Sequence, residues 1–142
     1  PKLPDHPPDL SVQIPTRGRP EKLAACVRAL AHQTLDPTGR EGRYEVLVGL
    51  DGPDEHAARA ARDAWGSRPA QSLRLLDFPR TGHLPIRNAL IAHTSAPLVV
   101  FMNDDVVAQP GFLAAHLHAP VSYTHLRAHE TKANLVCRLL LE

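Results

Sequence analysis

The chain has 142 residues, a length that suits one domain with its own hydrophobic core. Its formal net charge of +1 gives no reason to expect binding to nucleic acid or to an anionic membrane. Its two cysteines, Cys26 and Cys137, match neither a disulfide framework nor a zinc motif, which favours a reducing, cytoplasmic compartment.

The first part of the chain predicts a lead-in, a strand and a helix. Residues 1–9 hold four prolines and no periodicity, so we expect them to be disordered. Leu10–Ile14 alternates apolar and polar side chains, which is typical of a short strand. Pro20 is well placed to open a helix after the loop 15–19. Apolar residues then follow at helical spacing: Leu23, Cys26, Val27 and Leu30.

Strands and helices alternate through the rest of the chain. Tyr44–Leu50 and Leu73–Leu76 read as strands, with an alanine-rich helix, Asp54–Trp65, between them. Pro85 to His93 predicts another helix, and Leu98–Met102 a strand buried on both faces. This alternation predicts a parallel α/β sheet. No apolar run approaches the roughly 18 residues that span a bilayer, and no signal peptide is visible.

The last predicted strand ends in an amide and two carboxylates, Asn103, Asp104 and Asp105. Adjacent anions repel unless a cation, a donor or solvent compensates them, and a divalent metal carrying a phosphorylated substrate would suit them. A solvated acidic turn is the alternative interpretation. Right-handed crossovers bring parallel strand ends to one edge, so Thr16, Asp51 and Asp105 should meet there. That convergence favours a functional site.

Other polar groups are expected near the same edge. Thr16–Arg19 offers a hydroxyl, guanidinium groups and free amides for a phosphate, although an ordinary turn is equally compatible. It matches neither a Walker loop nor a dinucleotide-binding glycine motif. Asp51 could accept hydrogen bonds from a base or ribose, or simply form the turn that Asp-Gly favours. Arg80 and Arg87 add positive charge, although arginines are mostly exposed surface residues.

Several short motifs occur in a fixed order between residues 10 and 119. They are Ser11–Pro20, Tyr44–Val48 with Asp51-Gly52, Gly82 with Arg87-Asn88, and Val100–Asp105 with Pro110 and Phe112-Leu113. Together they resemble the family 2 glycosyltransferases, whose members have the GT-A fold. Each motif is weak alone, but the ordered set is specific. The last one is similar to the Asp-x-Asp metal motif and its downstream proline.

This resemblance implies an α/β, Rossmann-like GT-A fold with a mainly parallel sheet flanked by helices. Residues 10–119 would be an incomplete nucleotide-sugar-binding domain. The implied activity is sugar transfer from a nucleotide-diphospho-sugar to an unknown glycan, lipid or protein acceptor, with inversion and the help of Mg²⁺ or Mn²⁺. A membrane-peripheral parent is compatible with it. The alternatives are a non-catalytic nucleotide-binding fragment and a nucleotidyltransferase with a similar sheet.

The resemblance also assigns roles to residues at the expected edge. It places Asp51 at the base, Arg87 near the diphosphate and Asp105 at the metal. The expected nucleotide-sugar contacts are Pro15, Thr16, Arg17, Arg19, Asp51, Arg87, Asn103 and Asp104. Two positions depart from the family pattern. Asn103 replaces the usual first aspartate, so Asp104 would take the ribose contact, and Leu50 replaces the first of two aspartates, which leaves base recognition to Asp51 alone.

The end of the chain does not continue this pattern. An inverting enzyme needs a general base, and the carboxylates after Asp105, Glu130 and Glu142, have no family-like context. We therefore expect this chain to carry the donor-binding half and to be inactive by itself. Residues 120–142 resemble the read-through of a sequencing adapter, and we interpret them as non-native. The alternative is an amphipathic helix built on Leu135, Val136, Leu139 and Leu140.

Overall fold

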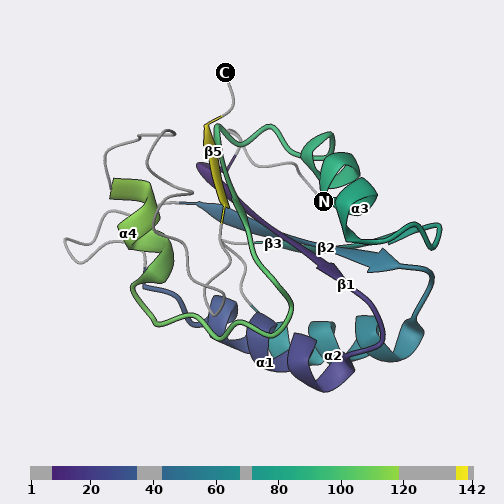
Figure 1. The fold of residues 1–142 in the computed structure, drawn as a ribbon. Coiled ribbons are helices and arrows are strands. Elements are labelled where there is room, and N and C mark those ends of the chain that lie inside the picture. The colour runs from purple at the N-terminus through teal and green to yellow at the C-terminus, as the bar shows by residue number, and fades with distance from the viewer. Residues whose placement is uncertain (1–7, 35–42, 68–71, 119–136, 141–142) are drawn as a thin grey trace.

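The computed structural model describes residues 8–34, 43–67, 72–118 and 137–140. They form a five-stranded sheet in the order β3-β2-β1-β4-β5, with helices on both of its faces (Figure 1). The elements in chain order are β1 (Leu10–Thr16), α1 (Pro20–Ala31), β2 (Tyr44–Asp51), α2 (Glu55–Trp65), β3 (Ser72–Phe78), α3 (His83–Ile91), β4 (Leu98–Phe101), α4 (Phe112–His118) and β5 (Cys137–Leu140).

The first four strands are parallel, as the alternation of strands and helices predicts. Both α1 and α2 lie on one face of the sheet, and α3 lies on the other (Figure 1). This arrangement confirms the predicted α/β class. β5 pairs antiparallel with β4 at the edge of the sheet. A strand at Cys137–Leu140 contradicts the helix alternative for those residues, and the remainder of 120–142, like residues 1–7, lies outside the described parts of the chain.

β1 is longer than its pattern predicts, because Pro15 and Thr16 continue the strand instead of starting a loop. Pro15 pairs in register with Gly49 on β2. On the other side of β1, the last residue that pairs with β4 is Gln13, whose carbonyl accepts a hydrogen bond from the Met102 amide at 3.0 Å. The backbone nitrogen of Pro15 points to the same side as the Gln13 carbonyl, beyond the last residue pair between β1 and β4. The N–H that proline lacks would therefore have had no partner in the sheet.

Alternate side chains of the central strands fill two cores. The larger core lies under α1 and α2 and includes Leu10, Val12, Ile14, Val46, Val48, Leu50, Leu98, Val100 and Met102. The smaller core joins Leu47 to Ile86 and Leu90 of α3. Gly49 lets α3 approach this face, since a Cβ there would lie 2.5 Å from Ile86 Cγ2. The period of two along each strand therefore decides which helix a side chain meets.

Side-chain hydrogen bonds fix one end of each helix that covers the larger core. Asp54 caps α2, its carboxylate accepting from the Ala57 amide at 3.0 Å. The Tyr44 hydroxyl donates to the carbonyl of Leu30 in the last turn of α1, with 2.6 Å between the oxygens. Such a carbonyl has no partner within its own helix, so the bond from β2 stabilises the end of α1.

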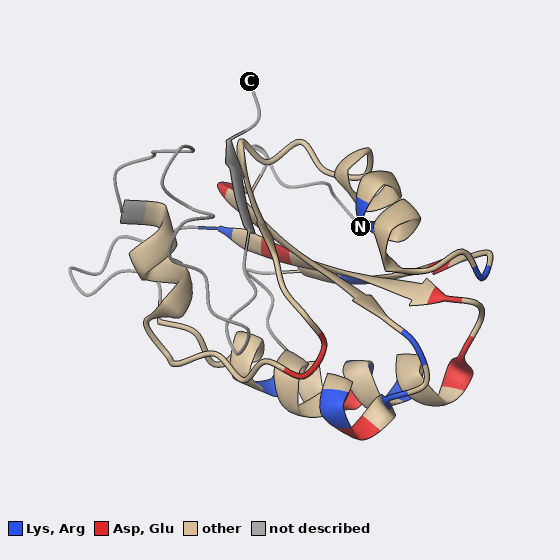
Figure 2. Ribbon diagram, viewed as in Figure 1, with Lys and Arg blue, Asp and Glu red and all other residues tan. Residues whose placement is uncertain are grey.

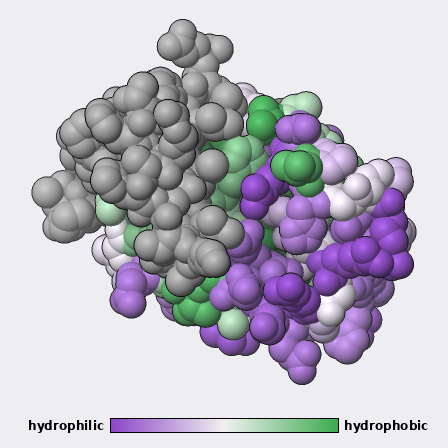
Figure 3. All heavy atoms as spheres, viewed as in Figure 1, coloured by the Kyte–Doolittle hydropathy of each residue, from purple (hydrophilic) through white to green (hydrophobic). Residues whose placement is uncertain are grey.

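The surface drawn in Figure 3 is mostly hydrophilic where it belongs to described residues. Among the described residues, the large hydrophobic side chains with high exposure are Leu84 at 71% and Val107 at 64%. No helix in the described ranges is long and apolar enough to cross a membrane. The chemistry of the chain is therefore best sought among its polar groups.

Candidate functional site

The carboxyl ends of β1, β2 and β4 meet at one edge of the sheet, which we call the rim. Thr16 pairs with Leu50, so Asp51 is the next residue along β2, and Asn103 to Asp105 follow shortly after β4. Figure 2 shows the basic segment after β1 at the same end of the sheet as the acidic segments after β2 and β4. Ligands of open parallel sheets bind outside such strand ends.

Strand alternation divides the rim into two sides. Thr16 continues the row of Ile14, which faces α1 and α2, and its side chain meets Asp104 there. Asp51 continues the row of Leu47 and Gly49, which faces α3. A ligand lying across the rim would thus meet one group of side chains from the α1 side and another from the α3 side.

On the α1 side, Asp104 joins β1 to the segment after β4. The Thr16 hydroxyl donates to Asp104 Oδ2 at 2.8 Å, and Arg19 Nη1 donates to Asp104 Oδ1 at 3.4 Å. Arg19 Nη1 also lies 3.7 Å from Asp105 Oδ2. Asp104 is 3% exposed, whereas the side chains of Asp105 and Arg19 are 47% and 49% exposed. Asp105 is therefore the accessible carboxylate, and one guanidinium offsets the charge of both acids.

Cys26 of α1 contacts the segment Asn103 to Asp105, and no sequence motif indicates this contact. Its thiol donates to the backbone carbonyl of Asn103, with 3.8 Å between sulfur and oxygen. Burial, with a smaller contribution from the charges of Asp104 and Asp105, raises the pKa of Cys26 to about 12. The side chain stays a neutral thiol at physiological pH, so it positions the loop and is no nucleophile.

On the α3 side, Asp51 holds the loop that leads into α3. Its Oδ1 accepts two backbone hydrogen bonds, from the Thr81 amide at 2.9 Å and the Gly82 amide at 3.2 Å. Gly82 has φ of 95°, a conformation that favours glycine, and this explains the glycine before α3. The neighbouring Gly52 amide donates to the Phe78 carbonyl at 2.9 Å. The ends of β2 and β3 are thereby fixed to each other.

These contacts also keep Asp51 ionised. Burial by itself would raise the pKa of Asp51, but the amide hydrogen bonds from Gly82 and Thr81 oppose it. The charges of Arg17 and His83 add to that opposition, and the net result is a pKa below the ordinary 3.8. Asp51 is therefore a carboxylate, which can accept hydrogen bonds and cannot donate one.

Arg87 reaches the rim from α3 and is half-buried, in contrast to an ordinary surface arginine. Its Nη2 donates to Asn103 Oδ1 at 3.2 Å, and its guanidinium lies 5.8 Å from the centre of the Phe101 ring. Its Nε is buried and has no partner among the described residues. The predicted departure at Asn103 has a structural use, because the amide oxygen there holds Arg87 in place.

The remaining sequence candidates lie around these two groups. Pro15 is buried at the end of β1, and Arg17 is exposed in the following loop, near enough to Asp51 to lower its pKa. Arg80 lies over Gly52, where a Cβ would come within 3.2 Å of its Nε. The structure thus brings Thr16, Arg19 and the two aspartates together on one side, and Arg87 with Asn103 on the other. Thr81 was not among the predicted site residues, since its contribution is a backbone amide.

The carboxylates at the rim suit a divalent cation that takes some of its ligands from the protein and the others from a substrate. No group of three His, Cys, Asp or Glu side chains in the described ranges could hold a metal ion by itself. Mg²⁺ is commonly held by one or two carboxylates together with substrate phosphates and water, however. Asp105 supplies an accessible carboxylate next to Asp104, and this suits Mg²⁺ or Mn²⁺ delivered with a diphosphate.

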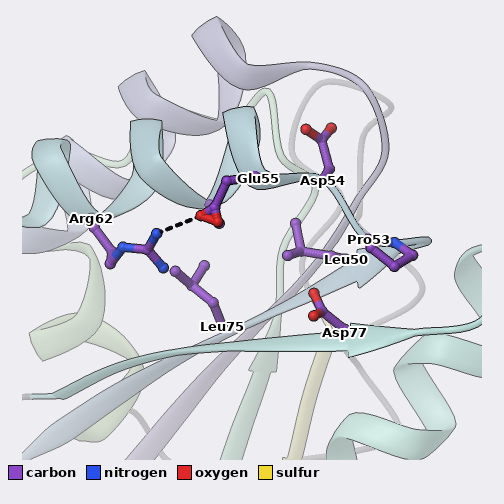
Figure 4. Close-up of a pocket in the computed structure, with 8 residues that line it drawn as sticks. Leu50, Pro53, Asp54, Glu55, Arg62, Leu75 and Asp77 are labelled. Carbon is purple, nitrogen blue, oxygen red and sulfur yellow. Dashed lines mark hydrogen bonds and ion pairs between the residues drawn. The ribbon is translucent and has the colours of Figure 1, made fainter.

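A separate pocket of about 190 Å³ lies beside α2, between β2 and β3 (Figure 4). Its walls include three carboxylates, two of which already have structural partners. Asp54 caps α2, and Glu55 pairs with Arg62 at 2.9 Å. The third, Asp77, is exposed on β3. The pocket opens on the α2 face, whereas Asp51 belongs to the α3 face, so it is not part of the rim.

Solved structures with a similar fold include a mannosyltransferase and a protein bound to UDP. The mannosyltransferase PcManGT from Pyrobaculum calidifontis, described in complex with GDP-Man and Mn²⁺, is 20% identical with a TM-score of 0.58 over 71% of this chain and 28% of its own. S. aureus TarS 1-349 in complex with UDP is 19% identical with a TM-score of 0.62 over 76% of this chain and 30% of its own. The chain thus spans less than a third of either protein.

The likeness to these structures confirms the expected GT-A, Rossmann-like fold. A search of curated proteins found no significant match. The family model for glycosyl transferase family 2 matches residues 11–119, which hold β1 to α4 and every rim residue described above. The chain therefore belongs to glycosyl transferase family 2.

Proposed function

We propose that this chain is the donor-binding part of a metal-assisted, inverting glycosyltransferase that uses a nucleotide-diphospho-sugar. The observation that carries the proposal is the pair Asp104–Asp105, held by Thr16 and faced by Arg19 at the edge where α/β sheets bind ligands. Family membership supports the reaction class. The GDP-Man, Mn²⁺ and UDP complexes of proteins with this fold support the class of donor and the divalent metal.

Each side of the rim would bind a different part of the donor. Arg17 and Arg19 are exposed cations that suit the diphosphate, next to the accessible Asp105. On the α3 side, Asp51 would meet the base, and Arg87 adds charge near the diphosphate. Each oxygen of Asp104 already accepts one hydrogen bond, so a ribose hydroxyl would use a remaining lone-pair site or take the place of the half-exposed Arg19.

The chemistry follows from the charge of the leaving group. Sugar transfer expels a nucleoside diphosphate, and a bound Mg²⁺ or Mn²⁺ stabilises the negative charge that develops on it. Asp105 would hold the metal, while Thr16 keeps Asp104, and with it the whole segment, in place. Arg17 and Arg19 would orient the diphosphate from the loop before α1.

Transfer also requires a general base, which is not among the described residues after Asp105. Residues 106–118 and 137–140 contain no carboxylate. We therefore expect this chain to bind a donor without transferring its sugar, which makes a nucleotide-binding fragment the second candidate function. The buried thiol of Cys26 is compatible with the cytoplasmic location that the cysteine pattern favours.

Calorimetric titration of UDP, GDP and dTDP, each with and without Mn²⁺, tests the proposal. Hydrolysis of the matching nucleotide sugars is measured in parallel. We expect at least one nucleotide to bind in a Mn²⁺-dependent manner, with little or no hydrolysis. Absence of Mn²⁺-dependent binding to all three would overturn both candidate functions. Steady hydrolysis or transfer would show that this chain is catalytic by itself.

A further inference from the structure

We propose that Gln13 is a positioning residue for Arg87, which it holds at the rim from inside the sheet. One end of its amide fixes α3 on β1, and the other end serves the buried Nε–H of Arg87. The inference deepens the proposed function, on which it rests only where it predicts an effect on nucleotide binding.

Gln13 is an amide at a position of the sheet that is surrounded by apolar side chains. It is fully buried, and its partners in register are Leu47 on β2 and Phe101 on β4. Leu47 belongs to the smaller core, so this row of side chains faces α3. An amide in such surroundings destabilises the fold unless hydrogen bonds compensate for its lost hydration. The bonds that Gln13 makes therefore indicate its use.

The nitrogen of this amide ties α3 to the sheet. Gln13 Nε2 donates to the Ser11 hydroxyl on its own strand and to the Leu90 carbonyl of α3, both at 3.2 Å. A carbonyl only accepts, so the nitrogen must be the end of the amide that faces Leu90. Apolar contacts are non-directional and would let a helix slide on the sheet, whereas this bond sets its position. Arg87 lies three residues before Leu90 on α3, so its position is set as well.

The remaining polar atoms of the two side chains are complementary. Among the described residues, the buried side-chain nitrogen and oxygen atoms without a partner are Gln13 Oε1, an acceptor, and Arg87 Nε, a donor. Phe101 lies next to both, because it pairs with Gln13 in register and its ring centre is 5.8 Å from the Arg87 guanidinium. One buried water that donates to Oε1 and accepts from Nε–H would satisfy both groups.

Holding Arg87 in this way prepares it to bind an anion. An arginine side chain has five N–H donors. The Nε–H is used inside the protein, and Nη2 donates to Asn103 Oδ1 at 3.2 Å. Three N–H donors then remain in a fixed direction, and a ligand that binds them loses less entropy than one that must order a mobile side chain. The diphosphate is the anion that the proposed function puts on this side of the rim.

Hydrogen exchange at the Arg87 Nε–H tests the inference on the free protein. The signal in a ¹H–¹⁵N spectrum is identified by its loss in Arg87→Gln. We expect its exchange with solvent to be at least about tenfold slower than that of Arg62, an exposed arginine on α2. In Gln13→Met, which keeps a side chain of similar length without the amide, exchange at Arg87 should become at least about tenfold faster.

Gln33→Met is the matched control. Gln33 is also a buried glutamine, whose Nε2 donates to the Gln109 carbonyl at 2.7 Å and whose Oε1 accepts from the Leu113 amide at 2.9 Å. Its replacement should lower the melting temperature without changing the exchange at Arg87. Unchanged exchange at Arg87 in Gln13→Met, or equal acceleration in both glutamine variants, would overturn the inference.

A double-mutant cycle shows whether Gln13 acts on nucleotide binding through Arg87. UDP, GDP and dTDP are titrated with Mn²⁺ present into the unaltered chain, Gln13→Met, Arg87→Gln and the double variant. We expect Gln13→Met to weaken nucleotide binding about fivefold by itself and to cause no further loss in the Arg87→Gln background. The same loss in both backgrounds, or no loss in either, would refute the positioning role.

Failure of the inference differs from failure of the proposed function. If none of the three nucleotides binds to the unaltered chain, the proposed function fails, while the exchange measurement still decides whether Gln13 holds Arg87. Thermal melting by circular dichroism establishes whether Gln13→Met folds. Should it fail to fold, the unaltered protein decides the question, because exchange at Arg87 as fast as at Arg62 would overturn the inference.

Discussion

Two neighbouring carboxylates at the end of β4 have different surroundings and therefore different uses. Asp104 is buried and bonded to Thr16, so it holds the strand ends together. Asp105 is about half exposed and meets only Arg19 among the described residues. Loss of the buried hydrogen bond between Thr16 and Asp104 would destabilise the fold, whereas an exposed ion pair such as Arg19–Asp105 contributes about 0–1 kcal/mol. Asp105 can thus exchange its partner for a metal at little cost.

Arg19 should compete with a metal for the acid pair. Its guanidinium lies within 4 Å of both carboxylates, which lowers their attraction for another cation. In Arg19→Gln we expect Mn²⁺ alone to bind more tightly, within about fivefold. Titration of Mn²⁺ followed by its electron paramagnetic resonance signal measures this directly.

Arg62→Gln is the control for Arg19→Gln, because Arg62 is an exposed arginine whose ion pair with Glu55 lies on α2. It should leave the Mn²⁺ affinity unchanged. Weaker binding of Mn²⁺ to Arg19→Gln would show that Arg19 helps to hold the metal site and does not compete for it.

The lowered pKa of Asp51 predicts that the stability of the fold depends on pH. Its folded-state pKa lies below the ordinary 3.8, so its charge stabilises the fold above that value. This contribution disappears as the pH falls through the folded-state pKa. Urea unfolding should therefore show Asp51→Asn less stable than the unaltered chain at neutral pH, and the difference should shrink in acid.

Asp77→Asn controls for the loss of one negative charge elsewhere on the sheet. The difference in the free energy of unfolding between Asp51→Asn and the unaltered chain should depend on pH. If it stays constant from neutral pH to the most acidic pH at which the fold persists, this assignment of charge is wrong.

At the scale of elements, α3 is the part of the molecule whose position matters most to the site. It carries Arg87, begins next to the loop held by Asp51, and packs on β2 through Ile86 and Leu90. Gln13, buried on β1, also donates to the Leu90 carbonyl at 3.2 Å. The helix is short, so its packing on the sheet, more than its own propensity, keeps it in place.

Gly49→Ala tests this packing. The added Cβ would lie 2.5 Å from Ile86 Cγ2, so α3 must shift, and overpacking of this kind costs about 1–3 kcal/mol. Urea unfolding should show this loss, and UDP binding should weaken as Arg87 moves with the helix. Gly111→Ala, where a Cβ meets nothing within 4 Å, should be close to neutral. Equal stability of the two variants would contradict the packing argument.

At the scale of the whole molecule, the sequence was sufficient for the order of β1 to β4 and of the helices between them, but it did not predict β5. The apolar runs of β1, β2 and β4 are interrupted by helical patterns, and right-handed crossovers leave one edge for their ends. The predicted convergence of Thr16, Asp51 and Asp105 at that edge follows from this rule alone. Their specific roles in donor and metal binding stay predictions.

The partners of these residues could not be predicted. Thr16 and Asp104 are 88 positions apart, and Asp104 and Asp105 are chemically identical in the sequence. Which of them is buried depends on the side of the sheet to which each turns after β4 ends. The bonds to Asp51 come from backbone amides, which every residue except proline carries, so no side-chain pattern indicates them.

The origin of residues 120–142 also stays a prediction. Within them the structure describes Cys137–Leu140 as a strand against β4. Independent sequencing of the source DNA with adapter sequences removed distinguishes the two readings. We expect a different continuation after about residue 119, and recovery of the same tail from genomic DNA would refute the read-through interpretation.

The central claim is that the carboxylates after β4 bind a divalent metal together with a nucleotide diphosphate. Its most direct test is Mn²⁺ affinity, measured by electron paramagnetic resonance with saturating UDP, in the unaltered chain, in Asp105→Asn and in Asp77→Asn. We predict that Asp105→Asn weakens Mn²⁺ binding at least about tenfold, whereas Asp77→Asn leaves it unchanged. Equal Mn²⁺ affinity in all three proteins would contradict the claim.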